Sequence, residues 1–373
     1  EVRGVLGTSA DASYVYFAAN GIPDGLSGSP NGRGESAEVG GCAESPKSSP
    51  PAGCNLYLAH DGEVSFIARL EVGGAGGFQT DAADWVTTLR GIASVDVDKA
   101  ARVSSDGKAL LFRSQRRLTS YENEGTPEFY LYRVGVGMSC VSCNPTGEAP
   151  GRQPKLGSMA TPVLEPGRPA STLSRNLSAD GQRVFFETTD PLVVEDTNGA
   201  AGCPAVGSRL QNFSACSDVY EWEAPGSGSC TAARAVAGGG CIYLLSTGKG
   251  SEPALIADAS ADGKDVYLFS RSRLAGQDGD SLQDVYDVRV DGGLASQNQA
   301  PPPVPCEGEG ACRPAATPPP PSPSAATGSF VGPPNPKPSV KHKKHKHKKH
   351  HHKKRKRHNH SGQRARRGGL GSR

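Results

Sequence analysis

Residues 177–199 read LSADGQRVFFETTDPLVVEDTNG, a Ser-Ala-Asp-Gly turn followed by an apolar segment and a second turn rich in Asp, Thr and Asn. The same plan occurs in four segments of the chain. In each segment, apolar residues stand four and six positions after the aspartate of the first turn, as Val184 and Phe186 do after Asp180. Apolar residues two apart directly after a turn predict a β-strand with one buried face. The four turn aspartates are Asp11, Asp106, Asp180 and Asp262.

Each repeat has room for about four short strands, one before the turn, one after it and two further on. In the third and fourth repeats the next strand begins with Asp-Val-Tyr, at Asp218 and Asp284. A single four-stranded unit cannot bury its faces alone, so neighbouring units must stack. Radial stacking gives a β-propeller; an open β-solenoid is the alternative, although its rungs are usually shorter. We therefore predict an all-β propeller over residues 1–296. Its four repeats span about 5–70, 100–150, 172–250 and 254–295.

The pattern S-x-D-G-x-x-V-x-F followed by D-V-Y resembles the WD40-like repeat of TolB-type propellers. The segments LSADGQRVFFET, DVYEWEA and DASADGKDVYLFSRSRL are similar to secreted or surface proteins of high-GC actinobacteria. The resemblance covers about residues 100–336 and extends loosely to 1–70, where Ser27 replaces the acid of the second turn. It implies four-stranded blades and an extracytoplasmic location. Propellers of this type usually have six or more blades, so we expect further blades upstream of the four visible ones.

Charge divides the chain into two parts. Of the 41 Lys and Arg residues, 16 lie from Lys337 onward, where no Asp or Glu occurs, and 25 accompany the 38 acidic residues before it. The body therefore has a net charge of about −13 and the tail about +16. Residues 297–340 are Pro-rich and predict an extended linker. Residues 341–373 lack the apolar residues of a core and predict a disordered tail. No apolar run is long enough to predict a membrane-spanning helix.

The ten cysteines fall into five close pairs, which favours disulfides that close short loops. Disulfides indicate an oxidising, extracytoplasmic setting. Zinc is the alternative, but only Cys140 and Cys143 have the tight spacing of a zinc site. The expected pairs are Cys42 with Cys54, Cys140 with Cys143, Cys203 with Cys216, Cys230 with Cys241, and Cys306 with Cys312.

The body of the chain offers no arrangement typical of a nucleophilic hydrolase. Eight of the nine histidines lie in the tail, and His60 precedes the turn Asp61-Gly62, where we expect a solvated turn residue. A Ser-His-Asp or Cys-His site would need a second histidine in the body. We therefore expect a protein that is not an enzyme. The alternative is a propeller glycoside hydrolase or lyase that uses loop carboxylates, because acids are abundant on the predicted loops.

Acidic turns in three repeats form a candidate metal site. Oxygen ligands two residues apart on a turn, with another carboxylate at the start of the next strand, could hold Ca²⁺. The alternative is that Asp and Asn occur here because turns favour them. None of the segments matches the twelve-residue EF-hand loop. The candidate calcium ligands are Asp196, Asn198, Asp218, Asp278, Asp280, Asp284, Glu122, Glu124 and Glu128.

The tail segment KHKKHKHKKHHHKKRKRHNH has three interpretations. As a polycation it would bind anionic cell-envelope polymers such as teichoic acids, anionic lipid headgroups or nucleic acid, in a salt-dependent way. As a His-rich tract it would bind Zn²⁺, Ni²⁺ or Cu²⁺. As a solubilising segment it would have no dedicated partner. The predicted polyanion-binding residues are Lys341, Lys343, Lys344, Lys346, Lys348, Lys349, Lys353, Lys354, Arg355, Lys356 and Arg357.

These features predict an extracytoplasmic propeller that binds an unknown protein or glycan and is held near the cell envelope by its tail. A purely structural surface protein is the third candidate. Carboxylates that converge at one end of the propeller would favour the enzyme, and the lack of a pocket would favour the structural protein.

Overall fold

In the computed structural model, the described residues contain β-strands and no α-helix, which confirms the all-β prediction. The described residues are 2–26, 30–42, 54–71, 81, 100–157, 174–199, 205–206, 213–214, 216–232, 235–236 and 239–296. The chain divides into the units Glu1–Val304 and Pro305–Arg373. The predicted linker over 297–340 and the predicted tail over 341–373 lie outside the described residues. The described residues therefore contain no helix that is long and apolar enough to cross a membrane.

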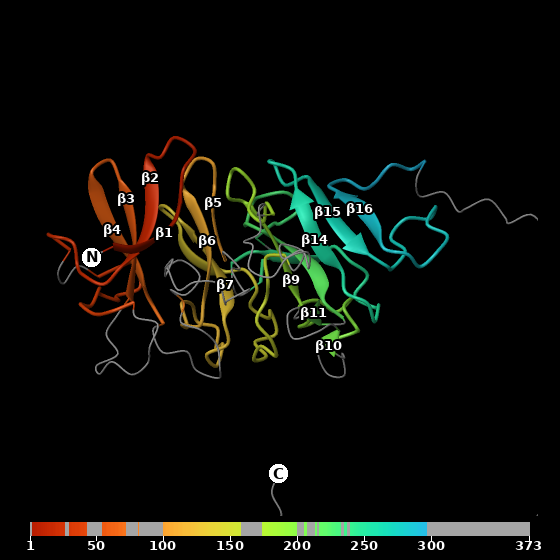
Figure 1. Cartoon of the computed structure of the whole chain (residues 1–373), viewed down its shortest axis with the longest axis horizontal. Coiled ribbons are helices and arrows are strands. Elements are labelled where there is room, and N and C mark those ends of the chain that lie inside the picture. Colours follow the sequence, from red (N-terminus) through yellow and green to blue (C-terminus); the bar gives the residue numbers. More distant parts are fainter. Residues whose placement is uncertain are drawn as a thin grey trace, which may run out of the picture. The chain divides into compact units, whose positions relative to one another are not determined.

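Four antiparallel sheets follow one another along the first unit (Figure 1). The first sheet is formed by β1 (Val2–Thr8), β2 (Tyr14–Ala19), β3 (Cys54–His60) and β4 (Glu63–Leu70). The second is formed by β5 (Ala101–Val103), β6 (Ala109–Ser114), β7 (Glu128–Arg133) and β8 (Gly137–Cys140). The third is formed by β9 (Arg183–Thr188), β12 (Asp218–Glu223) and β13 (Cys241–Leu244). The fourth is formed by β14 (Leu255–Ala259), β15 (Asp265–Ser270) and β16 (Asp284–Arg289). A separate hairpin pairs β10 (Ala205–Val206) with β11 (Phe213–Ser214).

The four Ser-x-Asp turns share one set of hydrogen bonds, which explains why their sequence repeats. In the third turn, Ser178 Oγ donates to Asp180 Oδ1 at 2.6 Å and accepts the N–H of Arg183 at 2.9 Å. Asp180 Oδ1 also accepts the N–H of Gln182 at 3.0 Å. The two side chains thus satisfy backbone donors that a tight turn leaves unpaired. The serine-to-aspartate distances elsewhere are 2.6 Å for Ser9–Asp11, 2.6 Å for Ser104–Asp106 and 2.8 Å for Ser260–Asp262.

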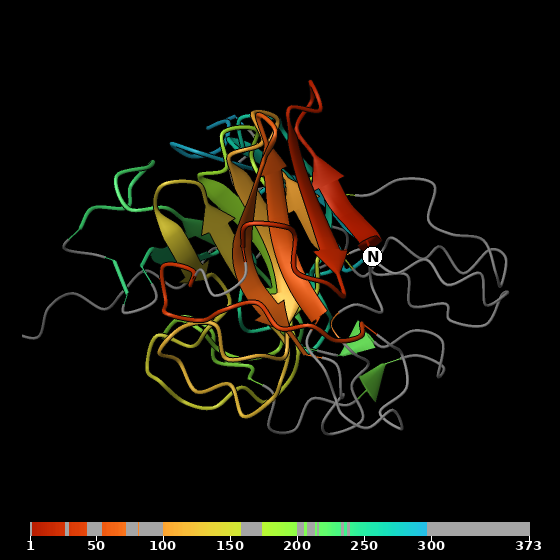
Figure 2. The same cartoon turned by 90° about the vertical axis from the view of Figure 1, so that its left-hand side faces the viewer.

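Backbone hydrogen bonds join each of these turns to the next one, and we call this series the turn ladder. The N–H of Ala10 donates to the carbonyl of Ser105 at 3.0 Å, and the N–H of Ser105 donates to that of Ala179 at 3.1 Å. The N–H of Ala179 in turn donates to the carbonyl of Ala261 at 2.7 Å. The turn ladder therefore places the four sheets side by side in chain order, and Figure 2 shows the first sheet in front of the others.

Glycine in the later turns permits close packing of each turn on the sheet before it. Gly181 has a φ of 66°, and a Cβ added there would lie 2.3 Å from the Cβ of Ala109. Gly263 has a φ of 69°, and its Cβ would lie 2.9 Å from Cδ of Arg183. Only glycine meets both demands without strain. In the first turn Ala12 takes this position and adopts a φ of 59°.

Buried side chains fill the spaces between adjacent sheets. The strands β9 and β12 are buried along their whole length, so successive residues such as Phe185 and Phe186 pack against different neighbouring sheets. This two-sided burial explains why these strands read as continuous apolar or mixed runs rather than as a simple alternation. The main contributors are Tyr16, Leu56 and Phe112 between the first two sheets, Leu111, Phe186 and Trp222 between the next two, and Phe185, Val219 and Leu268 between the last two.

Three of the five predicted disulfides are present among the described residues. They join Cys42 to Cys54, Cys140 to Cys143, and Cys230 to Cys241. Cys216 is disulfide-bonded as well. The remaining cysteines of the predicted pairs, Cys203, Cys306 and Cys312, lie outside the described residues.

The third and fourth repeats depart from the expected four strands. In the third, the first strand is reduced to an isolated bridge between Leu177 and Val184. In the fourth, Asp291 and Gly292 form a turn after β16 with φ values of 66° and 92°. The same type of turn leads from β3 to β4 in the first sheet, but residues 293–296 do not pair with β16. Each of these two sheets therefore has three strands, and the described residues do not close into a ring.

Candidate functional site

The predicted metal ligands of the second turns accept hydrogen bonds from tyrosines of the next strand. Asp196 Oδ2 accepts the hydroxyl of Tyr220, and Asp278 Oδ2 accepts that of Tyr286. Asp196 Oδ1 also accepts the N–H of Asn198 at 3.3 Å. Burial raises the pKa of Asp196, against the opposing effect of the Tyr220 hydrogen bond. The acid that stands sixteen residues after the turn aspartate thus has a structural partner in both repeats.

The acids that begin the third strand of a repeat accept hydrogen bonds from serines. Asp218 Oδ1 accepts Ser246 Oγ at 2.5 Å and the N–H of Gly248 at 3.1 Å. In the second repeat the buried Glu128 accepts Ser142 Oγ. Each serine also accepts an N–H from the strand, at 3.1 Å for Ser246 and 2.9 Å for Ser142. Among the described residues, Asp218 Oδ2 is buried with no hydrogen-bond partner.

The fourth repeat brings its predicted calcium ligands together at the surface. Carboxylate oxygens of Asp278, Asp280 and Asp284 lie within 4.8 Å of one another. Hydrogen bonding by Tyr286 lowers the pKa of Asp278, so this carboxylate is ionised at neutral pH. Calcium binding by these three aspartates remains a prediction.

The second repeat does not bring its three acids together. Glu122 is exposed and pairs with Arg117 at 2.7 Å, whereas Glu128 is buried at the start of β7. Glu124 is exposed and adopts a φ of 49°. The acidic spacing looks the same as in the other repeats, but an arginine and a serine engage the carboxylates that calcium would need.

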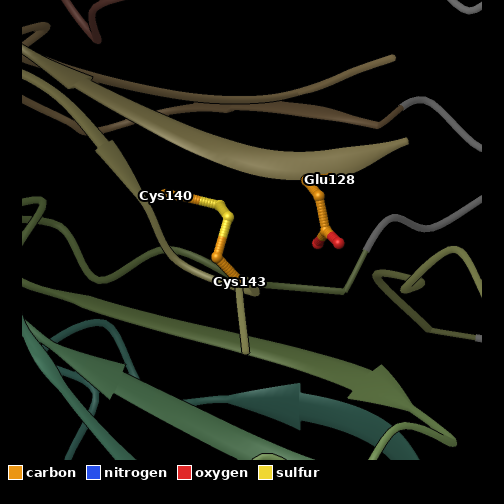
Figure 3. Close-up of side chains that lie close together, drawn as sticks. All are labelled: Glu128, Cys140 and Cys143. Atoms are coloured by element: carbon orange, nitrogen blue, oxygen red, sulfur yellow. A yellow bond between two sulfur atoms is a disulfide. The ribbon is translucent and has the colours of Figure 1, made fainter. Parts of the chain in front are cut away.

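The tight Cys140-Cys143 pair forms a disulfide beside Glu128 (Figure 3). A carboxylate oxygen and the two sulfur atoms lie within 4.8 Å of one another. Zinc binds thiolates, and neither sulfur of a disulfide is one. Burial raises the pKa of Glu128 well above its usual range, with Ser142 opposing the shift. This group is therefore a buried structural element of the second sheet, and the zinc alternative does not apply to it.

A cavity of about 400 Å³ opens between two connections that the sequence keeps far apart. Residues that follow β8 form one wall, and residues of the connection between β9 and β12 form the other. The described part of the lining contains two carboxylates and no Lys, Arg or His. The lining residues are Asn144, Glu148, Ala149, Gly151, Asp190, Pro191, Thr197, Asn198 and Gly199.

Asp190 holds the two walls of this cavity together. Its Oδ2 accepts the N–H of Gly151 at 2.8 Å and that of Arg152 at 3.3 Å. Burial raises the pKa of Asp190, and the two N–H groups oppose the shift. On the same side, the hydroxyl of Tyr121 donates to the carbonyl of Glu148 at 2.5 Å. The cavity thus contains the buried carboxyl of Asp190, which is fixed by hydrogen bonds, and the carboxylate of Glu148, whose backbone is held by Tyr121.

The opposite wall is fixed by the connection that follows β13. The N–H groups of Thr197 and Asn198 both donate to the carbonyl of Gly248, at 2.7 Å and 3.2 Å. Asn198 Nδ2 donates to the carbonyl of Gly250 at 2.8 Å. Asn198, which the sequence suggested as a calcium ligand, therefore uses its amide to hold the loop and also lines the cavity.

Sequence reasoning missed the two acids of the cavity. Asp190 stands ten residues after the turn aspartate of its repeat, where the second repeat has Arg116 and the fourth has Ser272. The residues that the repeats share specify the fold. A residue that differs from its counterparts in the other repeats is therefore a candidate for a role specific to its own repeat. This departure was the available signal for Asp190, whereas Glu148 lies in a connection with no counterpart to compare.

The lone body histidine is part of the first sheet. His60 ends β3 and stacks on Tyr14 with ring centroids 3.7 Å apart. Its Nδ1 lies 3.1 Å from the carbonyl of Ser13. His60 thus precedes the Asp61-Gly62 turn as expected, but its ring packs on the sheet instead of being fully solvated. The polyanion-binding residues expected in the tail lie outside the described residues.

A buried acid pair lies between the third and fourth sheets. Arg183 binds Glu221 at 2.8 Å and Glu223 at 2.9 Å. Burial raises the pKa of Glu221 to about 7, although Arg183 opposes the shift. The three side chains are at most 10% exposed, so no substrate reaches them in this arrangement. This pair does not supply the loop carboxylates of a glycoside hydrolase.

No protein-family model matches the chain, and no curated protein matches it. Among solved structures, the chain is similar to an acylaminoacyl peptidase from Pyrococcus horikoshii, at 11% identity and a TM-score of 0.31, over 74% of this chain and 30% of that one. The uncomplexed form of that enzyme gives 11% identity and a TM-score of 0.28, over 74% and 29%. The tricorn protease gives 8% identity and a TM-score of 0.31, over 78% and 22%. The chain therefore spans less than a third of the length of each of these structures.

These neighbours correct one expectation. The sequence predicted a protein that is not an enzyme, because the body lacks a histidine pair, whereas the three similar structures are peptidases. The expectation was wrong because the histidine count bears only on catalysis by a histidine of the body. A lack of enzymatic activity is accordingly no part of the function proposed below.

Proposed function

We propose that unit Glu1–Val304 is part of a β-propeller that serves as a binding domain, with its ligand in the cavity between the second and third sheets. The cavity carries this proposal, because two connections and a buried carboxyl build it as a fixed, concave site. Polar groups that converge in a concave site are typical of ligand binding.

The propeller interpretation has four supports. Consecutive repeats form consecutive sheets, the sheets pack face to face, and the turn ladder joins them along one edge. Each later turn also places a glycine directly against the preceding sheet. This combination is expected where β-sheets of one repeat stack radially.

The lining of the cavity indicates a ligand that donates hydrogen bonds and carries positive charge. Glu148 and Asp190 supply carboxyl groups, and the described lining contains no Lys, Arg or His, although the charge of Arg152 beside it opposes the rise that burial causes in the pKa of Asp190. Ala149 and Pro191 add a small apolar surface, and none of the described lining residues is an aromatic that could stack on a sugar ring. We therefore propose a peptide with a Lys or Arg side chain as the ligand, in preference to a glycan.

Calorimetry with short Lys- and Arg-containing peptides tests this site. We expect the exchange Glu148→Gln to weaken binding at least tenfold, while the control exchange Glu252→Gln at another exposed acid leaves it unchanged. Peptide binding that Glu148→Gln does not alter would overturn the assignment of the cavity. Equal binding of a neutral oligosaccharide would overturn the peptide as ligand.

We also propose an extracytoplasmic location and a tail that holds the protein on polyanions. The three disulfides support an oxidising environment, and the 16 Lys and Arg residues from Lys337 onward support the electrostatic attachment. Retention on anionic vesicles should fall steeply between 50 and 200 mM salt, as expected for about six or more ionic contacts. Retention that does not depend on salt would contradict the role of the tail.

A further inference from the structure

The outer face of the fourth sheet repeats an interface that the other sheets use. Three positions on the adjacent strands β9 and β12 of the third sheet lie on the face toward the fourth sheet, and the fourth sheet has the equivalent positions on β15 and β16. In the third sheet these are Arg183, Glu221 and Glu223, and in the fourth they are Asp265, Asp287 and Arg289. Both sets thus contain one arginine and two carboxylates. We call them the third and the fourth triad.

The turn that begins the fourth sheet covers Arg183 of the third triad, and the connection after β12 covers Glu223. Glu223 accepts the N–H of Ser229 at 3.0 Å and lies against Gly228. Arg183 Nη1 points to the carbonyl of Gly263 at 3.4 Å, and Gly263 packs on the aliphatic part of the same side chain. Equivalent contacts place Gly181 on Ala109 and Gly107 on Tyr14. A Ser-x-Asp-Gly turn is therefore the partner of this face at all three described junctions.

The fourth triad has no such cover among the described residues. Arg289 Nε lies 2.8 Å from both Asp265 and Asp287, with its side chain 41% exposed. On the same face, Tyr267 is 37% exposed and Val285 is 60% exposed. Equivalent positions in the second sheet, such as Leu111 and Phe129, are completely buried. An exposed face with this mixture of apolar and paired charged groups is typical of an interaction surface.

The turn ladder ends in complementary groups. Among the described residues, the N–H of Ala261 has no backbone acceptor and the carbonyl of Ala10 has no backbone donor. The ladder always runs from the N–H of one turn to a carbonyl of the following turn. The open donor of the fourth turn therefore matches the open acceptor of the first turn of another molecule.

The first sheet also leaves part of its outer face open. A cluster around Tyr57 and Phe66 covers the outer strands of this face with residues such as Ile22 and Leu26. On the innermost strand β1, by contrast, Val2 and Val5 are 59% and 55% exposed. The uncovered part thus lies beside the end of the turn ladder.

We propose that the outer face of the fourth sheet binds the first sheet of a second copy of this chain. The Ala10 turn of the partner covers the fourth triad and continues the turn ladder, and the reciprocal contact closes a ring of two chains about a twofold axis. This inference rests on the proposed propeller architecture, but it does not depend on the cavity. Failure of dimerisation would leave the peptide-binding measurement on the cavity unaffected.

Light scattering on the full chain at physiological salt tests the proposal. We expect twice the monomer mass, and at least a tenfold loss of dimer affinity for Val285→Arg. The matched control is Val194→Arg at another exposed valine, which should leave the dimer intact. A monomeric wild-type chain, or a dimer that Val285→Arg leaves intact, would overturn the proposal.

Mixing two variants identifies which faces meet. Val285→Arg and Val5→Arg should each be monomeric alone, because each variant damages both junctions of the ring. A mixture should form a heterodimer, since the fourth sheet of one chain and the first sheet of the other are then both unaltered. Dimerisation of Val5→Arg alone would instead show like-to-like pairing of fourth sheets, and a mixture that fails to associate would equally overturn the assignment.

The first turn supplies an independent test. Ala12 stands where the turns of the internal junctions have glycine, so its Cβ must be accommodated against Asp265 of the partner. We expect Ala12→Gly to raise the dimer affinity several-fold, because glycine removes the Cβ and suits the φ of 59°. An unchanged or weaker dimer would contradict docking of this turn.

Discussion

The third and fourth triads each contain one arginine and two carboxylates, with the arginine and one carboxylate exchanged between the two strands, and they differ in what covers them. Arg183, Glu221 and Glu223 are buried under the next turn and the connection after β12, whereas Arg289 and its two aspartates are partly exposed to solvent. Water screens the exposed group, but the buried group depends entirely on its own hydrogen bonds. The comparison shows that the repeat fixes the position of a charged side chain. The residues that cover this position determine how much the charge contributes to the free energy of unfolding.

Removal of the arginine should separate the two triads most clearly. Arg183→Met leaves two carboxylates buried without a cation, so we expect a loss of about 3–5 kcal/mol in unfolding free energy. Arg289→Met should cost less than about 1 kcal/mol, because its partners remain solvated. Denaturant unfolding measures both. Equal losses would show that the two faces have the same environment.

The buried third triad should also make the unfolding free energy depend on pH. Because burial raises the pKa of Glu221 from 4.5 to about 7 in the folded state, folding is favoured while this group is protonated. Its contribution is fully present below pH 4.5 and is lost as the pH rises to about 7. The stability of Glu221→Gln relative to wild type should therefore rise by up to about 3 kcal/mol over this interval.

Unfolding curves at a series of pH values provide the measurement. A difference between wild type and Glu221→Gln that stays constant from pH 4.5 to 8 would contradict the buried position of Glu221.

Covered and uncovered turns should also respond differently to a methyl group. Gly181→Ala must place its Cβ against the Cβ of Ala109 on the covered face, so we expect a loss of about 2–3 kcal/mol. Gly292→Ala has open space around it, and only its φ of 92° is unfavourable, so a loss of about 1 kcal/mol is expected. Thermal unfolding distinguishes the two, and equal losses would argue against tight packing at the turn ladder.

The all-β character and the repeated turn-and-strand unit were predictable because the decisive interactions are local. Ser178, Asp180 and Arg183 interact within six residues, so the turn and the following strand are encoded in one short pattern. Disulfides such as Cys42–Cys54 were visible for the same reason. The missing fourth strand was not visible, since the turn at Asp291 and Gly292 resembles the one that leads into β4.

The roles of the acids could not be predicted from their spacing. Asp196 and Asp218 receive hydroxyl groups from Tyr220 and Ser246, whose positions depend on the pairing of distant strands. The cavity was even less predictable from local sequence, because its lining comes from two distant connections, one after β8 and one after β9. Spacing indicates where an acid stands along the chain, but only packing indicates which donor it meets.

The turn ladder has a mechanical consequence. Its three bonds connect main-chain atoms only, so side-chain substitutions leave the donors and acceptors themselves in place. The bonds act in series, so a pulling force applied to the two ends would load all three equally. Because sheets in such a row contact only their neighbours, we expect extension to proceed by detachment of single sheets in discrete steps.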